Sequence, residues 1–268
     1  MSDGSDDTAV PPPLIAPDHE RRFGGLRRLL GEQAAQKVFG AHVVVIGIGG
    51  VGSWTAEALA RSGMGRLTLI DMDHVAESNV NRQIHALDGT LGMAKVTAMR
   101  DRIRQINPDC DVRVVDDFVT DRNWPGLLAD ASGPLAVVDA CDQVRAKQAM
   151  AHWAMVHRVP FVAVGAAGGK RLPHRVEMGD LAEVTHDPLL AQLRYRLRKH
   201  HGASRQGRMG VSCVFSREAV RPADASCSTQ ATDHSLSCHG YGSSVTVTAT
   251  FGMCAAAWVM NALADAKK

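Results

Sequence analysis

Apolar and polar positions alternate along the first two thirds of the chain in a way that predicts strands and helices in turn. Short β-branched or aliphatic runs, typical of strands buried on both faces, are separated by segments that favour helix. The expected strands cover 42–47, 66–71, 112–115, 135–139 and 160–165. The expected helices cover 19–39, 52–62, 95–106 and 143–157. This alternation predicts an α/β fold with a doubly wound, mostly parallel sheet of the Rossmann-like kind.

The pattern changes after Gly168. The segment 170–185 predicts a short antiparallel or irregular piece, and 189–199 predicts a strongly basic helix. Two polar, glycine- and serine-rich loops are expected over 202–210 and 221–244. The chain therefore predicts one domain rather than two, with a C-terminal elaboration that follows the alternating part.

Both ends of the chain differ from its middle. Residues 1–17 are acidic and then proline-rich, which predicts a disordered tail before a single domain over 18–268, elaborated from about residue 170. The stretch 245–263 is the longest apolar one, but threonines and Asn261 interrupt it. It falls short of an uninterrupted membrane span, so we expect a buried strand plus helix and no stable membrane insertion.

Composition adds three constraints. The 268 residues are 45% hydrophobic, which is enough for an ordinary globular core. The net charge of +2 provides no global attraction to nucleic acid, so any such binding needs a local patch. The 6 cysteines form no CxxC pair, which argues against structural zinc and a disulfide framework and favours a reducing, cytoplasmic location.

The sequence GIGGVG follows the first expected strand and precedes a helix, as in strand–turn–helix sites that cradle phosphate. Gly47 would allow the tight turn, Gly49 would let a phosphate approach the backbone, and Gly52 would let the helix pack closely. Gly50 lies between them in the same turn. The turn alone leaves NAD, FAD and ATP open, and also a turn that binds nothing.

Residues further along favour ATP with Mg²⁺ over a dinucleotide. Asp71 ends the second strand, where an acidic residue holds a ribose. Arg82 and Lys95 follow, and such cations suit the phosphates of a triphosphate. Asp142 comes directly after the fourth strand, where a carboxylate can hold Mg²⁺ against phosphate, although Asp142 is also a plausible helix cap.

Five motifs in this order resemble the ATP-binding core of the ubiquitin-activating-enzyme superfamily, over about residues 20–170: GIGGVG, DMD, NVNRQ, GMAK and DACD. That superfamily includes the bacterial adenylyltransferases of molybdopterin and thiamine biosynthesis. The resemblance implies formation of an acyl-adenylate from ATP with release of pyrophosphate. It further implies roles in nucleotide and metal binding: Gly47, Gly49, Gly50 and Gly52 against the nucleotide, Asp71 on the ribose, Asn79, Arg82, Gln83 and Lys95 on the phosphates, and Asp142 on Mg²⁺.

Finer motifs separate two branches of the superfamily. Adenylyltransferases of sulfur-carrier proteins usually have CxxC pairs, which this chain lacks, and an N-terminal arginine that reaches a partner's site. That arginine's position is Gly25 here, which leaves Arg22 and Arg28 as candidates. Five other segments, spread over nearly the whole chain, are similar to the tRNA threonylcarbamoyladenosine dehydratases: 82–87, 102–108, 115–119, 165–169 and 210–216.

The second resemblance implies a homodimer that acts on tRNA carrying threonylcarbamoyladenosine. ATP would activate the threonine carboxylate, and loss of that oxygen would close a ring, a net dehydration. A basic cluster could hold tRNA phosphates or could equally be a solvated helix face with a mobile loop. Its members are Arg194, Arg196, Arg198, Lys199, His200, His201, Arg205 and Arg208.

Cys238 lies in a polar loop, where an exposed thiolate would be possible. The resemblance implies a catalytic role as acyl acceptor or persulfide, with a sulfur-transfer partner, and the alternative is a tolerated cysteine. The cysteines in or beside apolar runs are expected to be packing residues: Cys110, Cys141, Cys213 and Cys254.

Three other functions remain open from the sequence. The first is adenylylation of a ubiquitin-like sulfur-carrier protein, against which the missing CxxC pairs argue. The second is a nucleotide-sensing module without turnover, against which the phosphate-polarising Arg82 and Lys95 argue. A dehydrogenase is the least favoured, because a diphosphate on a glycine turn needs no such pair of cations.

Overall fold

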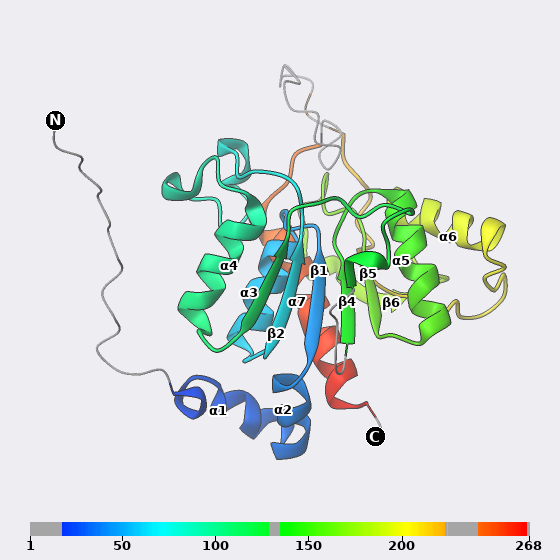
Figure 1. Ribbon diagram of the computed structural model, residues 1–268. Coiled ribbons are helices and arrows are strands. Elements are labelled where there is room, and N and C mark those ends of the chain that lie inside the picture. Colours follow the sequence, from blue (N-terminus) through cyan, green and yellow to red (C-terminus); the bar gives the residue numbers. More distant parts are fainter. Residues whose placement is uncertain (1–17, 129–134, 223, 225–240, 267–268) are drawn as a thin grey trace.

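The computed structural model describes residues 18–128, 135–222, 224 and 241–266 (Figure 1). The helices are α1 His19–Leu30, α2 Glu32–Phe39, α3 Gly52–Arg61, α4 Lys95–Ile106, α5 Val144–His157, α6 Pro188–His200 and α7 Val245–Ala264. The strands are β1 His42–Ile46, β2 Arg66–Ile70, β3 Asp111–Val115, β4 Leu135–Asp139, β5 Phe161–Val164, β6 Val176–Asp180 and β7 Ser212–Ser216. The predicted doubly wound α/β fold is confirmed.

The strands form one 7-stranded sheet in the order β3-β2-β1-β4-β5-β7-β6. Neighbouring strands are parallel except β6, which runs antiparallel to β7 at the edge. The chain moves outward from β1 in one direction and from β4 in the other, so the strand order switches between these two. Ligands of open α/β sheets bind outside the carboxyl ends of the strands at such a switch point.

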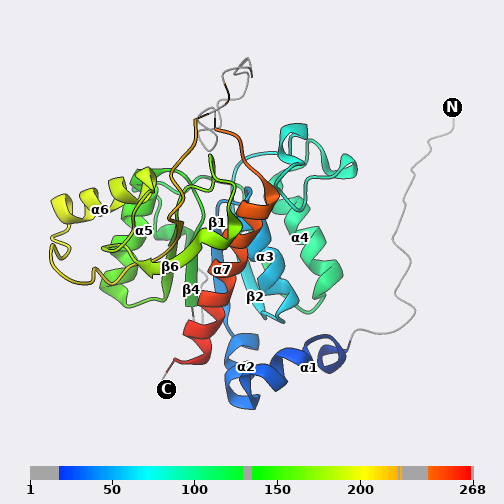
Figure 2. The ribbon, with the colours of Figure 1, turned by 180° about the vertical axis from the view of Figure 1, so that it is seen from behind.

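Alternate residues of the central strands supply the two cores. Val43 and Val45 pack on one face with α3, α4 and α7, while Val44 and Ile46 pack on the other with α5 and α6. Figure 2 shows α7 beside α3 on the first face. Because both faces are covered, β1 is buried along its whole length, which explains its uninterrupted apolar sequence.

Three expectations about elements need correction. The segment 19–39 is two helices rather than one, because Gly31 adopts a positive φ of 83° and ends α1. The apolar C-terminal stretch 245–263 lies wholly within the single helix α7, and no part of it is a strand. The segment 210–216 contains β7, which the sequence did not predict as a strand and which lies between β5 and β6 in the sheet.

Helix α7 is long and apolar enough, by length and composition, to cross a membrane. Its position in the fold explains that composition. Val247, Phe251 and Val259 are fully buried in the core shared with α3 and the sheet. Gly252 lets the two helices approach closely, since a Cβ there would lie 2.7 Å from the Val51 carbonyl oxygen. The helix is a core element of this domain.

The buried imidazole of His42 makes stability depend on pH. It lies at the start of β1, 4% exposed, with Nε2 2.8 Å from Thr68 Oγ1. Burial lowers the pKa of His42 to about 4, as it does that of His85. Below pH about 6.5 the unfolded chain takes up protons that the folded chain excludes, so the free energy of unfolding falls as the pH falls towards 4.

We expect His42→Gln to flatten this decline by about 2 kcal/mol between pH 7 and pH 4.5, because one of the two buried imidazoles no longer titrates. Denaturant unfolding of both proteins at the two pH values measures the difference. An unchanged decline in the variant would show that the His42 imidazole is protonated as easily in the folded chain as in the unfolded one.

Candidate functional site

The glycine turn after β1 forms the base of the site. Gly47 has a φ of 83°, and a Cβ there would lie 2.8 Å from the Ala140 carbonyl oxygen. A Cβ on Gly52 would collide with the Gly47 carbonyl oxygen. A Cβ on Gly49 would meet no described atom within 4 Å. Only glycine therefore permits both the close packing of the turn and an open backbone at the surface that a phosphate would approach.

The carboxylate of Asp71 joins the turns that follow β1 and β2. Its Oδ2 accepts a hydrogen bond from the Ile48 backbone N–H at 2.6 Å, and its Oδ1 accepts one from the Asp73 N–H at 2.8 Å. Burial raises the pKa of Asp71, while the nearby Lys95 lowers it. Each oxygen keeps a further lone pair, so these bonds leave acceptor capacity for a ribose hydroxyl.

Lys95 is held at the same edge by an ion pair with Asp73. Its Nζ lies 2.7 Å from Asp73 Oδ2, and its backbone N–H donates to the Asp73 carbonyl oxygen at 2.9 Å. The Lys95 side chain is 8% exposed, whereas that of Asp73 is 46% exposed. Asp73, whose role the sequence did not indicate, thus orients the ammonium group at the mouth of the site.

Arg82 lies above the glycine turn. A Cβ on Gly50 would come within 3.4 Å of its side chain. Its carbonyl oxygen accepts hydrogen bonds from Trp54 Nε1 at 3.0 Å and from Thr248 Oγ1 at 3.4 Å. Its Nη1 donates to the carbonyl oxygen of Ser78 at 2.7 Å. Helices α3 and α7 therefore fix the backbone from which the guanidinium extends.

Asn79 and Gln83 are both 5% exposed, beside Arg82 in the chain. Asn79 Oδ1 accepts a hydrogen bond from the Ala76 N–H at 3.1 Å, so the Asn79 side chain shapes the loop. Gln83 Oε1 is buried without a hydrogen-bond partner among the described residues. The predicted contact of these two amides with phosphates stays a prediction.

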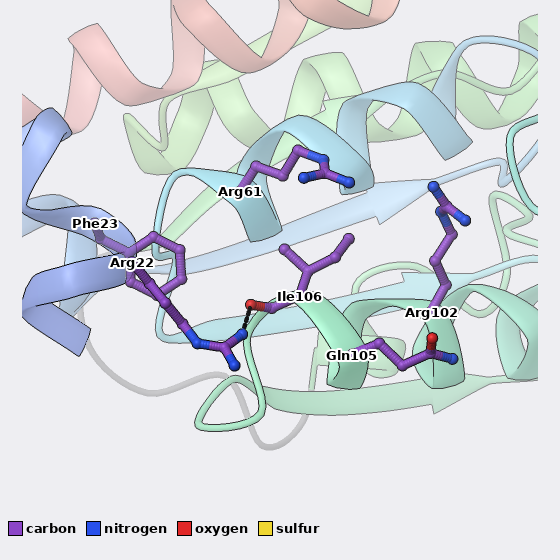
Figure 3. Close-up of a pocket in the computed structure, with 6 residues that line it drawn as sticks. All are labelled: Arg22, Phe23, Arg61, Arg102, Gln105 and Ile106. Carbon is purple, nitrogen blue, oxygen red and sulfur yellow. Dashed lines mark hydrogen bonds between the residues drawn. The ribbon is translucent and has the colours of Figure 1, made fainter. Parts of the chain in front are cut away.

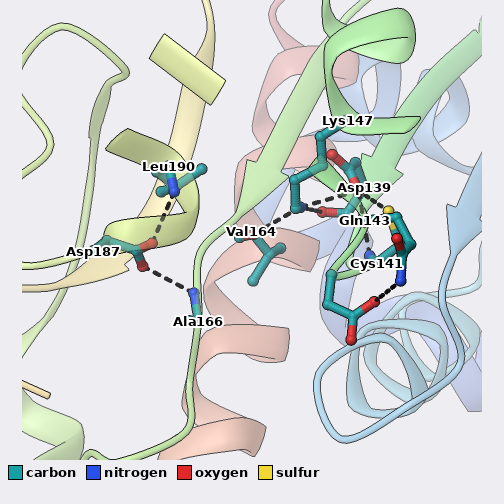
Figure 4. Close-up of polar contacts among 9 residues, drawn as sticks. Asp139, Cys141, Gln143, Lys147, Val164, Ala166, Asp187 and Leu190 are labelled. Atoms are coloured by element: carbon teal, nitrogen blue, oxygen red, sulfur yellow. Dashed lines mark hydrogen bonds and ion pairs between the residues drawn. The ribbon is translucent and has the colours of Figure 1, made fainter. Parts of the chain in front are cut away.

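Asp139, at the end of β4, forms a fully buried ion pair with Lys147 of α5 (Figure 4). The two side chains are 0% exposed, and Lys147 Nζ lies 3.1 Å from Asp139 Oδ1. Lys147 Nζ also donates to the carbonyl oxygen of Val164 at 2.8 Å, on β5. The ammonium group thus ties the carboxyl ends of β4 and β5 to α5.

The thiol of Cys141 belongs to this cluster. Its Sγ donates to Asp139 Oδ1 at 3.0 Å, and burial raises the pKa of Cys141 well above its usual value. Burial also raises the pKa of Cys110 to about 12 and that of Cys213 further still. These thiols stay protonated, and their predicted packing role is confirmed, as it is for the partly buried Cys254, which packs against the same core as Cys110. Cys238 lies outside the described residues.

Asp142 follows Cys141 and is half-buried. Among the described residues its carboxylate is contacted by Gln143 Nε2 alone, at 3.4 Å, so it is available to a ligand. The described part of the chain holds no group of 3 His, Cys, Asp or Glu side chains able to bind a metal. A lone carboxylate fits Mg²⁺, which proteins usually hold through one or two carboxylates together with substrate phosphates.

The candidate arginines of α1 lie away from this edge. Arg22 Nη1 donates to the carbonyl oxygen of Ile106, at the opposite end of α4 from Lys95 (Figure 3). Arg22, Arg61 and Arg102 line a cleft of about 430 Å³ there, where Arg61 and Arg102 both pair with the buried Glu57. Arg28, on the same helix as Arg22, is exposed. Arg22 therefore does not contact the glycine turn of its own chain.

The basic cluster lies on α6 and the loop after it. Asp187 caps α6, with Oδ1 accepting from the Leu190 N–H at 2.9 Å and Oδ2 from the Ala166 N–H at 2.8 Å (Figure 4). Ala166 follows β5, so the first turn of α6 is attached to the same edge of the sheet as the glycine turn. The cluster itself starts further along α6, at Arg194.

A glycine turn with an arginine, a lysine and an available carboxylate near it, all at the switch point, fits the ATP-binding class of doubly wound folds rather than the dehydrogenase class. Residues 23–268 match the ThiF family, and the chain belongs to this family.

Within the family, individual relatives resemble the chain over most of its length. It is 46% identical over 251 residues to the tRNA threonylcarbamoyladenosine dehydratase of Escherichia coli, covering 90% of this chain and 93% of the relative. The corresponding protein of Haemophilus influenzae is 39% identical over 93% of this chain and 96% of its own. A crystal structure of the Escherichia coli dehydratase in complex with ATP matches with a TM-score of 0.81 and 44% identity, over 93% of this chain and 97% of that one.

The buried ion pair of Asp139 with Lys147 should contribute far more to the free energy of unfolding than an exposed ion pair does. Lys147→Met leaves the Asp139 carboxylate buried and unpaired, so we expect a loss of about 3–5 kcal/mol in the free energy of unfolding. Arg217→Met removes an ion pair of 2.7 Å whose side chains are 52% and 41% exposed, and should cost less than about 1 kcal/mol. Equal losses in denaturant unfolding would contradict a structural role for the buried pair.

Proposed function

We propose that this protein is an ATP-dependent dehydratase that cyclises threonylcarbamoyladenosine in tRNA by adenylating its carboxylate. The observation that carries the proposal is the placement of Arg82, Lys95 and Asp142 around one glycine turn, in a chain with whole-length similarity to such dehydratases. Cations beside a glycine turn suit a triphosphate, and the similarity extends beyond the nucleotide site to the C-terminal part of the chain.

In this proposal the nucleotide lies along the carboxyl edge of the sheet. The backbone from Gly49 to Gly52 faces the phosphates at the start of α3, where N–H groups and the helix dipole favour an anion. Asp71 accepts from the ribose. Arg82 and Lys95 neutralise charge on the α-phosphate and on the departing pyrophosphate, which is the largest electrostatic change in the reaction.

The chemistry proceeds in two displacements. A carboxylate oxygen of the threonyl group attacks the α-phosphorus, and the bond from that phosphorus to the bridging oxygen of pyrophosphate breaks. A nitrogen of the carbamoyl or amide group within the same side chain then attacks the activated carbonyl carbon and loses its proton. AMP leaves with the original carboxylate oxygen, so ring closure removes one water in sum.

Mg²⁺, held by Asp142 and the phosphates, would supply charge neutralisation at the leaving group. The proposal includes a cytoplasmic homodimer in which Arg22 or Arg28 serves the site of the partner subunit, since Arg22 is distant from its own site. Internal attack by the substrate needs no enzyme nucleophile. A catalytic Cys238 with a sulfur-transfer partner therefore stays a prediction of the sequence alone.

The proposed reaction is tested by incubating the protein with ATP, Mg²⁺ and tRNA that carries threonylcarbamoyladenosine. We expect the modified nucleoside to lose the mass of one water and AMP and pyrophosphate to accumulate in equal amounts, as read by nucleoside mass spectrometry and nucleotide chromatography. Omission of ATP is the control.

An unchanged nucleoside in the presence of bound ATP would overturn the proposal. Pyrophosphate exchange that depends on a small protein ending in Gly-Gly would instead support adenylylation of a sulfur carrier.

Lys95→Ala separates catalysis from simple nucleotide binding. We expect kcat to fall by about 10²–10³-fold, because a cation that meets developing charge contributes more to the transition state than to the ground state. The dissociation constant for ATP should rise less than tenfold. Arg104→Ala, on the same helix, removes a cation whose side chain is 59% exposed and should change neither value. Equal losses of turnover and ATP affinity would indicate a binding role alone.

A further inference from the structure

The exposed face of α6 carries an aromatic ring among cations. Leu190, Leu193 and Leu197 bury one side of the helix. The helical spacing of Tyr195 and Lys199 places them together on the solvent side. Tyr195 is 61% exposed, and Lys199 Nζ lies 5.6 Å from the centroid of its ring. A tyrosine that is this exposed, with a cation over its ring, leaves a large flat surface available to a partner.

Internal hydrogen bonds hold several arginines of the basic cluster in place. Arg194 Nη1 donates to the carbonyl oxygens of Leu181 and Val184, at 3.1 and 2.8 Å. Arg198 Nε donates to the Ser204 carbonyl oxygen at 3.1 Å. These carbonyl partners are neutral, so the guanidinium groups keep their full positive charge. They also rigidify α6 and the following loop, which makes the helix a fixed platform.

Other basic residues lie at the end of α6 and in the loop that follows it. Lys199 and Arg205 are exposed. The Arg208 guanidinium is 3.8 Å from the buried Asp180 carboxylate and is itself 79% exposed. Tyr195 and Lys199 thus pair an exposed ring with a cation on a basic helix, whereas a surface that only attracts phosphate needs no exposed ring.

Helix α6 starts beside the carboxyl edge of the sheet, where the nucleotide is proposed to bind. Helix α6 begins at Pro188, whose predecessor Asp187 is bonded to Ala166 at the end of β5. At 1.5 Å per helical residue, Tyr195 lies about 10 Å along the helix from this start. For a single-stranded RNA loop that leaves the adenylation site over α6, the next bases come within reach of the ring.

We propose that Tyr195 stacks against an unpaired base of the substrate tRNA loop, next to the nucleotide that reacts, while Lys199 contacts a neighbouring phosphate. This inference rests on the proposed function for the identity of the RNA. Single-stranded RNA is recognised by stacking on aromatic side chains together with cations on the backbone. An acidic protein partner would be attracted by the same cations but would have no base to stack on the ring.

The test is binding of a stem-loop RNA whose loop carries threonylcarbamoyladenosine, measured without ATP so that no turnover is needed. We expect Tyr195→Ala to weaken binding about tenfold or more, and Tyr195→Trp and Tyr195→Phe to retain it, because each keeps a ring. Leu29→Ala is the matched surface control, since Leu29 is 79% exposed on α1.

Salt dependence distinguishes stacking from charge. Tyr195→Ala should keep the wild-type slope of log affinity against log salt concentration. Lys199→Ala should reduce the size of that slope by about 1, the amount that corresponds to one phosphate contact. A fully paired RNA hairpin stem should bind the wild type and Tyr195→Ala equally.

Binding of the stem-loop by Tyr195→Ala at wild-type strength, or an equal loss on loop and paired RNA, would overturn the inference. If loop binding depends on Tyr195 but the dehydration reaction fails, the proposed function is overturned and the inference about Tyr195 is not.

Discussion

The site depends on one carboxylate that joins two turns. Asp71 ends β2, and its two oxygens hold the backbone N–H groups of Ile48 and Asp73. The first bond sets the path of the glycine turn, and the second sets the loop in which Asp73 pairs with Lys95. Loss of this carboxylate would remove one hydrogen bond from each turn at once, at the point where the pairing of β1 and β2 ends. The backbone of the glycine turn and the ammonium group of Lys95 are therefore positioned by the same group.

On the other side of the switch point, a fully buried ion pair holds β4, β5 and α5 together. Lys147 connects Asp139 of β4 with the carbonyl oxygen of Val164 on β5, so the loop that carries Asp142 starts from a rigid base. Such a pair is costly to bury and adds little stability over a well-packed apolar substitute, but it is strongly destabilising to break. Its place beside Asp142 indicates that it fixes where the loop with Asp142 begins rather than adding stability to the sheet.

Much of the fold and part of the site follow from local sequence. The uninterrupted apolar run of β1 and the glycines after it predict a buried parallel strand and a phosphate turn, because both depend on neighbouring residues. The apolar surroundings of Cys110 and Cys213 likewise predict protonated packing thiols. Pairings between distant segments do not follow in this way. The contacts of Asp73 with Lys95 and of Asp139 with Lys147, and the position of β7 between β5 and β6, depend on tertiary packing that no spacing encodes.

The central claim is that the substrate carboxylate itself is adenylated at this site. It is tested most directly with threonylcarbamoyladenosine in tRNA whose two carboxylate oxygens are both ¹⁸O, followed by mass spectrometry of the nucleotide products. Our account predicts one ¹⁸O atom in the phosphate of AMP for each ring formed and none in inorganic phosphate. Label in inorganic phosphate would show attack at the γ-phosphorus, and unlabelled AMP with a cyclised nucleoside would show that the carboxylate oxygen never reached the α-phosphorus. Either result would contradict an adenylation site built on the glycine turn.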